Sequence, residues 1–281
     1  MGRRLLGALV ALAVACPWGL LGSQAPADAA PCSEASPAVG MAPTVSGRGF
    51  YVMSTDGCIG TAGDASFEGQ PASLSAPIVG IAVAPDGSGY WEVGSDGGMF
   101  TFGHAPFFGS AGGLHLNAPI VGMAPTPSGR GYWFVAADGG IFAYGDARFY
   151  GSAGTLRLNA PIVGMAPTPT GRGYWLVGSD GGVFAYGDAT FVGSIGRMRL
   201  NQPIVGMART PSGQGYWFLA GDGGVFNFGD APFFGSATAS PGSGQPPAVA
   251  IAATPTGWGY WIAFRRNDQV DNYGDAVPVT G

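Results

Sequence analysis

The side chains best suited to acid–base or metal chemistry are few and scattered in this sequence. Its 281 residues include two histidines, His104 and His115, and three glutamates, Glu34, Glu68 and Glu92. No spacing pairs a histidine with a serine nucleophile and an acid. No Gly-x-Ser-x-Gly elbow, His-Glu-x-x-His motif, phosphate-binding glycine loop or EF-hand loop occurs. The sequence therefore predicts no catalytic residue, no metal ligand and no cofactor.

One acidic residue recurs in a Gly-Asp-Ala triplet. The five copies are Asp64, Asp146, Asp188, Asp230 and Asp275, and His104 holds the same place in one further copy. Five carboxylates could bind cations together, whereas an aspartate in a turn accepts nearby hydrogen bonds and fixes the local backbone. Because the triplet recurs in nearly every copy, we interpret the aspartate as structural and His104 as a drifted copy of it.

The triplet belongs to a longer repeat. Trp91, Trp133, Trp175 and Trp217 follow one another at intervals of 42 residues in nearly identical surroundings. A fixed period of this length is typical of repeat architectures. We divide the chain into six repeats, at residues 36–75, 76–117, 118–159, 160–201, 202–247 and 248–281. The first and last diverge most.

Each repeat predicts four short strands. In the fourth repeat an apolar Ile-Val-Gly-Met-Ala run ends at a proline-rich turn, and aromatic and β-branched residues 174–177 follow. An Asp-Gly-Gly hairpin turn leads into residues 183–186, and residues 191–193 supply the fourth strand. Four antiparallel strands in about 42 residues match a propeller blade. The fold prediction is an all-β, six-bladed β-propeller of four-stranded blades, and the alternative is an open solenoid of β-hairpins.

The aromatic residues of the repeat have a predicted place. In a strand, Tyr174 and Leu176 point to one face and Trp175 and Val177 to the other. Because both faces of a propeller blade pack against neighbouring blades, we assign the tryptophans to the core rather than to sugar stacking.

The first 29 residues have the layout of a secretory signal peptide. Arg3 and Arg4 precede an apolar run, and small residues lie just before a cleavage site at Ala30. Residues 30–35 then form a short N-terminal segment. The prediction is a secreted or envelope-associated protein with no membrane span after cleavage. The alternative is a lipoprotein anchored at Cys16.

Cleavage leaves two cysteines, Cys32 and Cys58. In an oxidising compartment an isolated pair of this kind predicts a disulfide. The bridge would tie the mature N-terminus to the first repeat.

The string Gly-Tyr-Trp-Leu-Val-Gly-Ser-Asp-Gly-Gly-Val-Phe-Ala-Tyr-Gly-Asp-Ala resembles a repeat of exported proteins of high-GC actinobacteria. The resemblance covers the chain from about residue 37 to its end. It implies a secreted, propeller-like module and brings no catalytic residues with it.

Composition limits the partners. Glycine (52) and proline (23) are too frequent for long helices, while a hydrophobic content of 46% is enough for a core. All basic residues are arginines, and the formal net charge is −5. A basic nucleic-acid surface is therefore excluded from our prediction.

We expect functional differences where the repeats disagree. One variable position, in the connection between repeats, carries His115, Arg157 and Arg199 beside the longer loop 237–247. It shares an end of the fold with the Asp-Gly-Gly hairpins. Arg130 and Arg172 occupy a second variable position at the opposite end.

The first of these variable sets gives the site prediction. A polar rim of this kind is typical of a binding face, and ordinary solubility is the competing interpretation. We predict a monomeric, non-catalytic binding module that recognises a protein or a cell-envelope glycan through His115, Arg157 and Arg199. The alternatives are a hydrolase or lactonase acting at the channel mouth and a purely structural envelope module.

Overall fold

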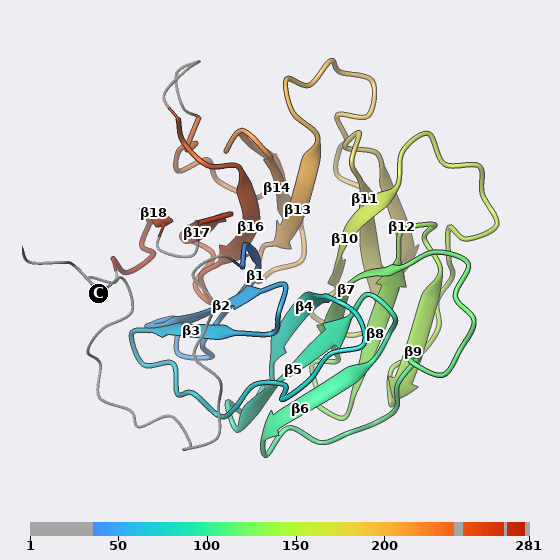
Figure 1. Ribbon diagram of the computed structural model, residues 1–281. Coiled ribbons are helices and arrows are strands. Elements are labelled where there is room, and N and C mark those ends of the chain that lie inside the picture. Colours follow the sequence, from blue (N-terminus) through green and yellow to red (C-terminus); the bar gives the residue numbers. More distant parts are fainter. Residues whose placement is uncertain (1–35, 239–243, 267–268, 279–281) are drawn as a thin grey trace, which may run out of the picture.

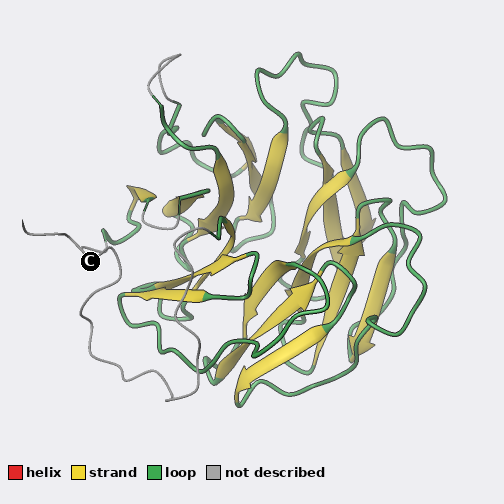
Figure 2. Cartoon of the chain, viewed as in Figure 1, coloured by secondary structure: helices red, strands yellow, loops and turns green. Residues whose placement is uncertain are grey.

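The described part of the chain consists of strands and their connections. A computed structural model describes residues 36–238, 244–266 and 269–278. Within these ranges there are eighteen strands and no helix (Figure 2). Accordingly, no helix of these ranges could cross a membrane. The predicted leader, residues 1–29, and the segment 30–35 lie outside the described residues.

The strands form six three-stranded antiparallel sheets, and each repeat contains one of them. The first strands are β1 (Ala38–Pro43), β4 (Ile78–Val83), β7 (Ile120–Pro125), β10 (Ile162–Pro167), β13 (Ile204–Arg209) and β16 (Ala248–Ala253). The second strands are β2 (Phe50–Ser54), β5 (Gly89–Gly94), β8 (Gly131–Ala136), β11 (Gly173–Gly178), β14 (Gly215–Ala220) and β17 (Gly259–Phe264). The third strands are β3 (Ile59–Ala62), β6 (Met99–Gly103), β9 (Ile141–Gly145), β12 (Val183–Gly187), β15 (Val225–Gly229) and β18 (Val270–Gly274).

In every sheet the second strand lies in the middle and is buried along its whole length. The first strand carries a β-bulge near its start. In β10 the register shifts between Ile162 and Gly164, which leaves Val163 as the extra residue. The same shift occurs in the other five first strands. A bulge increases the local twist of a strand.

Neighbouring sheets are joined by a repeated backbone hydrogen bond. The N–H of Ile162, at the start of β10, donates to the carbonyl of Ala137 in the preceding sheet (2.9 Å). The same bond joins the last sheet to the first, where Ala38 donates to Arg265 (2.9 Å). Strand β1 therefore contacts both β4 and β16. Figure 1 shows the six first strands around the middle of the molecule and β3, β6, β9, β12 and β18 toward its outside.

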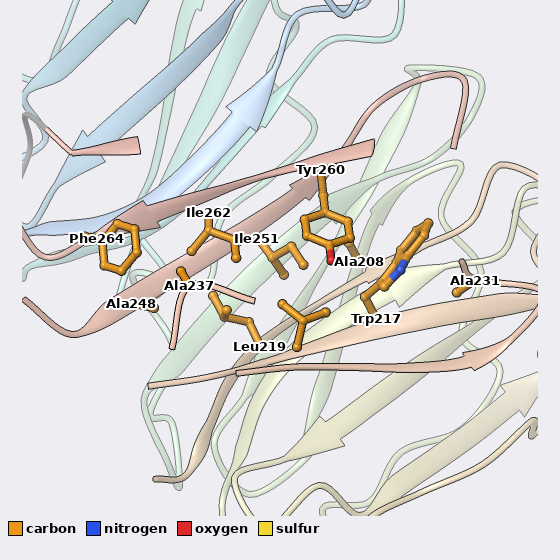
Figure 3. Close-up of a cluster of buried hydrophobic side chains, with 11 residues drawn as sticks. Ala208, Trp217, Leu219, Ala231, Ala237, Ala248, Ile251, Tyr260, Ile262 and Phe264 are labelled. Carbon is orange, nitrogen blue, oxygen red and sulfur yellow. The ribbon is translucent and has the colours of Figure 1, made fainter. Parts of the chain in front are cut away.

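The core is divided among the junctions between sheets. Each of six hydrophobic clusters is shared by two neighbouring sheets, and Figure 3 shows the one between β14 and β17. Between the fourth and fifth sheets, Trp175 and Val177 pack against Tyr216 and Phe218. The rings of Trp175 and Tyr216 meet edge to face at 5.9 Å. The repeated tryptophans Trp91, Trp133, Trp175 and Trp217 are all fully buried. Their predicted role in core packing is therefore confirmed.

The prediction of a fourth strand in each sheet is wrong. After β12, the N–H of Val192 donates to the hydroxyl of Tyr216 (3.3 Å), and that hydroxyl donates to the carbonyl of Gly193 (2.6 Å). The carbonyl of Thr190 accepts the Nε1–H of Trp175 (2.8 Å). Core side chains thus satisfy backbone groups that a fourth strand would have used for pairing.

The recurrent aspartate fixes the turn between the first and second strands. Asp146 accepts hydrogen bonds from the hydroxyls of Thr126 (2.8 Å) and Ser128 (2.6 Å), and its N–H donates to the carbonyl of Arg130 (3.0 Å). The same pattern of two hydroxyls on one carboxylate recurs at Asp64, Asp188, Asp230 and Asp275. The structural interpretation of this aspartate is therefore confirmed. We call this end of the sheets the aspartate end.

The second sheet replaces this arrangement. His104 stands where the other sheets have the aspartate, and Asp86 stands where they have the second hydroxyl residue. The N–H of Ser88 donates to Asp86 (3.0 Å). Hydrogen bonds from Ser88, and secondarily the charge of His104, lower the pKa of the Asp86 carboxyl. Hydrogen bonding between Ser88 and Asp86 thus takes the place of the contacts from two hydroxyls to one carboxylate in this turn.

Candidate functional site

The end of the sheets opposite the aspartates is built from Asp-Gly-Gly turns between the second and third strands. In the third sheet the carboxylate of Asp138 accepts the N–H of Gly140 (2.9 Å). Gly139 between them has φ +81°, a backbone conformation that L-residues rarely adopt. The turn is therefore fixed by its own sequence. We call this end of the sheets the hairpin end.

The connection to the next repeat is held against this turn. The N–H of Ala153 donates to the carbonyl of Gly139 (3.0 Å), and the N–H of Leu156 donates back to Ala153 (2.8 Å). Ala153 is fully buried, whereas Leu156 is 52% exposed. Arg157, next along the chain, is also exposed. The connection thus presents an apolar and a basic side chain to solvent.

Two further connections repeat this arrangement. Ala111 donates to the turn carbonyl of Gly97 (2.9 Å), and exposed Leu114 precedes exposed His115. In the fourth sheet, exposed Met198 precedes exposed Arg199. The predicted residues His115, Arg157 and Arg199 therefore occupy equivalent exposed places at the hairpin end of three successive sheets.

A cavity of about 660 Å³ opens where the fifth, sixth and first sheets meet. Bulge residues of three first strands line it, namely Val39, Val205 and Val249. Prolines and polar side chains complete the lining: Gln202, Pro203, Asp222, Gln245, Pro246, Pro247 and Arg265. Its volume is in the range of small-ligand pockets. Because Asp222 belongs to an Asp-Gly-Gly turn, this cavity also lies at the hairpin end.

Arg265 has a fixed backbone at the edge of this cavity. Its N–H donates to the carbonyl of Pro247 (2.8 Å), and its carbonyl accepts the N–H of Ala38 (2.9 Å). The structure does not bring His115, Arg157 or Arg199 into the cavity lining. The sequence signal for Arg265 was the loss of the Asp-Gly-Gly turn in the last repeat.

Sequence analysis also missed Glu92 as an unusual side chain. Glu92 lies in the middle of β5, its exposed fraction is 0%, and neither carboxyl oxygen has a hydrogen-bond partner. A Cβ on Gly57, in the turn of the first sheet, would lie 3.3 Å from its Oε2 atom. The carboxyl thus faces the junction between the first and second sheets. The corresponding residues in other sheets are apolar, for example Phe134 and Leu176.

Burial changes the acid–base behaviour of this carboxyl. Desolvation, and secondarily the charge of Asp56, raise the pKa of Glu92 from 4.5 to about 9. The side chain is therefore a neutral carboxylic acid at pH 7. Because the carboxyl lies at the first junction between sheets, its protonation state affects the stability of that junction.

The remaining predicted site residues are the cysteines. Cys58 is buried directly before β3. Cys32 lies outside the described residues, so the disulfide stays a prediction. Within the described ranges, no three His, Cys, Asp or Glu side chains cluster as metal ligands would.

The comparisons with known proteins add no relative. A scan against protein-family models and a search of curated proteins found no match to this chain.

Proposed function

We propose that the six sheets form a closed, propeller-like ring. The hydrogen bond from Ala38 to Arg265 supports this proposal, because it is the same bond that joins every other pair of successive sheets. The rings of Phe50 and Trp261 also pack at 6.0 Å across the last junction. Four of the other junctions pair tryptophan with tyrosine at the same place, and the first pairs Tyr51 with Tyr90. An open stack of hairpins would leave the first and last sheets apart.

We propose that the protein is a non-catalytic binding module that recognises a protein or a cell-envelope glycan through its hairpin end. The observation that carries this proposal is the repeated exposure of a large apolar side chain beside a basic one. Leu114, Leu156 and Met198 are 52–61% exposed, and each precedes a histidine or an arginine.

The fold does not need these apolar side chains at the surface. In the third repeat, Leu158, two residues after Leu156, packs on the core, whereas Leu156 itself points to solvent. Exposed apolar groups rimmed by polar residues are typical of interaction sites. The combination favours a partner that offers both an apolar and an acidic or hydrogen-bonding surface.

We propose that the protein acts outside the cytoplasm, because of its predicted signal peptide. Residues 1–29 would direct the chain out of the cytoplasm, and the likeness to exported actinobacterial repeat proteins agrees with this proposal. The envelope is then the first environment in which the hairpin end meets a partner.

The test is retention of the mature chain on three supports: purified cell-wall sacculi, immobilised envelope proteins and a glycan array. The variant R157Q/R199Q removes two basic side chains from the hairpin end. R130Q/R172Q is its matched control, because Arg130 and Arg172 are also exposed but lie at the aspartate end.

We expect retention of the unaltered chain on at least one support. R157Q/R199Q should weaken this retention at least about tenfold, since each charged contact contributes roughly 1 kcal/mol or more. R130Q/R172Q should leave the retention unchanged. No retention on any support would contradict the binding function. Equal loss in both variants would contradict the choice of face.

A further inference from the structure

The cavity at the hairpin end has an unpaired positive charge. Within the described ranges, the guanidinium of Arg265 forms no hydrogen bond or ion pair, although the backbone of this residue is fixed on both sides. Asp222 is the acidic residue of the lining, and its Oδ1 atom already accepts the N–H of Gly224 (3.1 Å). The cavity therefore has a cation that is available to an anionic ligand.

This charge is specific to one repeat. The positions that correspond to Arg265 in the other repeats hold small, uncharged residues, namely Thr55, Ser95, Ala137, Ser179 and Gly221. The turn itself functions without an arginine in those five sheets. The side chain of Arg265 is thus not required by the backbone that carries it.

The rest of the lining combines apolar residues with polar ones and contains no aromatic side chain among the described residues. Val39, Val205 and Val249 form one part of it, and three prolines form another. Among the described residues that line the cavity none is aromatic, so the flat surface on which neutral sugars usually stack is missing. Gln202 adds an amide group, which matches the hydrogen-bonding pattern of a peptide bond.

We propose that this cavity binds the free C-terminus of a peptide whose last residue has a small apolar side chain. The guanidinium of Arg265 pairs with the terminal carboxylate, the valines receive the apolar side chain, and the Gln202 amide contacts the last peptide group. This inference rests on the proposed binding function and names the partner class for one part of the hairpin end.

The experiment uses isothermal titration calorimetry on the mature chain. The probes are N-acetyl-Gly-Gly-Val as the free acid, the same peptide as its C-terminal amide, and N-acetylmuramic acid. The variants are R265Q, R265K and R266Q. Arg266 is adjacent and also exposed but is not among the residues that line the cavity, so R266Q is the matched control for charge. Thermal unfolding of each variant checks that it is folded.

The free acid should bind, and the amide should bind at least roughly tenfold more weakly, because a hydrogen bond to a charged group contributes about 1.5–3 kcal/mol. R265Q should bind the free acid more weakly by a similar factor, and R265K should lose less of this affinity. R266Q should bind the free acid as the unaltered chain does.

Three outcomes would overturn the inference: equal binding of acid and amide, full binding by R265Q, or no binding of the free acid. If N-acetylmuramic acid binds more tightly than the free-acid peptide and R265Q weakens that binding, the ligand of the cavity is a glycan carboxylate and not a peptide. If the peptide fails while the mature chain is still retained on a support, the proposed function stands and only the cavity assignment falls. If the mature chain neither binds the peptide nor is retained on any support, the proposed binding function is contradicted as well.

Discussion

Replacing Glu92 by leucine removes a carboxyl group that is fully buried and has no hydrogen-bond partner. Its pKa is about 9 in the folded chain, against 4.5 for an ordinary glutamate. The folded protein therefore binds this proton more tightly than the unfolded chain does. The stability that the protonated carboxyl contributes is complete below about pH 4.5 and is lost as the pH rises toward 9.

The size of the effect follows from this difference. One pKa unit corresponds to about 1.4 kcal/mol, so between pH 4.5 and pH 7 the native state loses about 3 kcal/mol relative to the unfolded chain. Leucine removes this loss and also fits the site, because Leu176 occupies the same position in β11. At pH 7 the Glu92→Leu variant should therefore be more stable by about 3 kcal/mol or more.

The assay is urea unfolding followed by tryptophan fluorescence, repeated from about pH 4.5 to about pH 9. The difference in unfolding free energy between Glu92→Leu and the unaltered chain should increase with pH over this range. Glu68→Gln is the control, since it also removes a carboxyl group but from an exposed side chain, and its stability difference from the unaltered chain should not show the increase expected for Glu92→Leu. Parallel stability curves for Glu92→Leu and the unaltered chain would refute the reasoning.

Three further outcomes are expected. Tyr174→Phe keeps the ring but removes a hydroxyl with two backbone partners, so urea unfolding should show a loss of about 1–2 kcal/mol; an unchanged midpoint would mean that these bonds do not support the junction. His104→Asp should raise the pKa of Asp86, measured by NMR titration, because a like charge replaces the histidine whose charge lowers it; an unchanged value would exclude the interaction. The mature chain should carry a Cys32–Cys58 disulfide, and Cys58→Ser should lower stability by about 2–4 kcal/mol. Alkylation of both cysteines in the folded, unreduced protein would contradict this pairing.

Much of the architecture could be predicted from local sequence. The 42-residue spacing of Trp133 and Trp175 predicted one sheet for each repeat, and the Asp-Gly-Gly turn predicted the hairpin between the second and third strands. The alternation of Tyr174 and Trp175 predicted that both faces of the second strand are covered. These features depend on strand periodicity and on turn chemistry, which a single repeat contains.

The features that could not be predicted depend on contacts between repeats. The segment after β12 forms no strand because Tyr216, from the next repeat, bonds its backbone. The aligned apolar residues of the other repeats mark Glu92 in the sequence, but the lack of a partner for its carboxyl depends on the first sheet, which covers it. The cavity unites Val39 with Arg265, from opposite ends of the described chain, and no local pattern indicates that they meet.

Amide hydrogen exchange at Ala38 tests ring closure, on which the assignment of the hairpin end and its cavity depends. The Ala38 N–H donates to Arg265 across the last junction, as Ile162 and Ile204 donate across internal ones (2.9 Å for all three). Because the three bonds are equivalent, Ile162 and Ile204 serve as internal standards. A closed ring predicts that Ala38 is protected to a similar degree. Exchange of Ala38 at the rate of an unprotected amide, with Ile162 and Ile204 still protected, would contradict it.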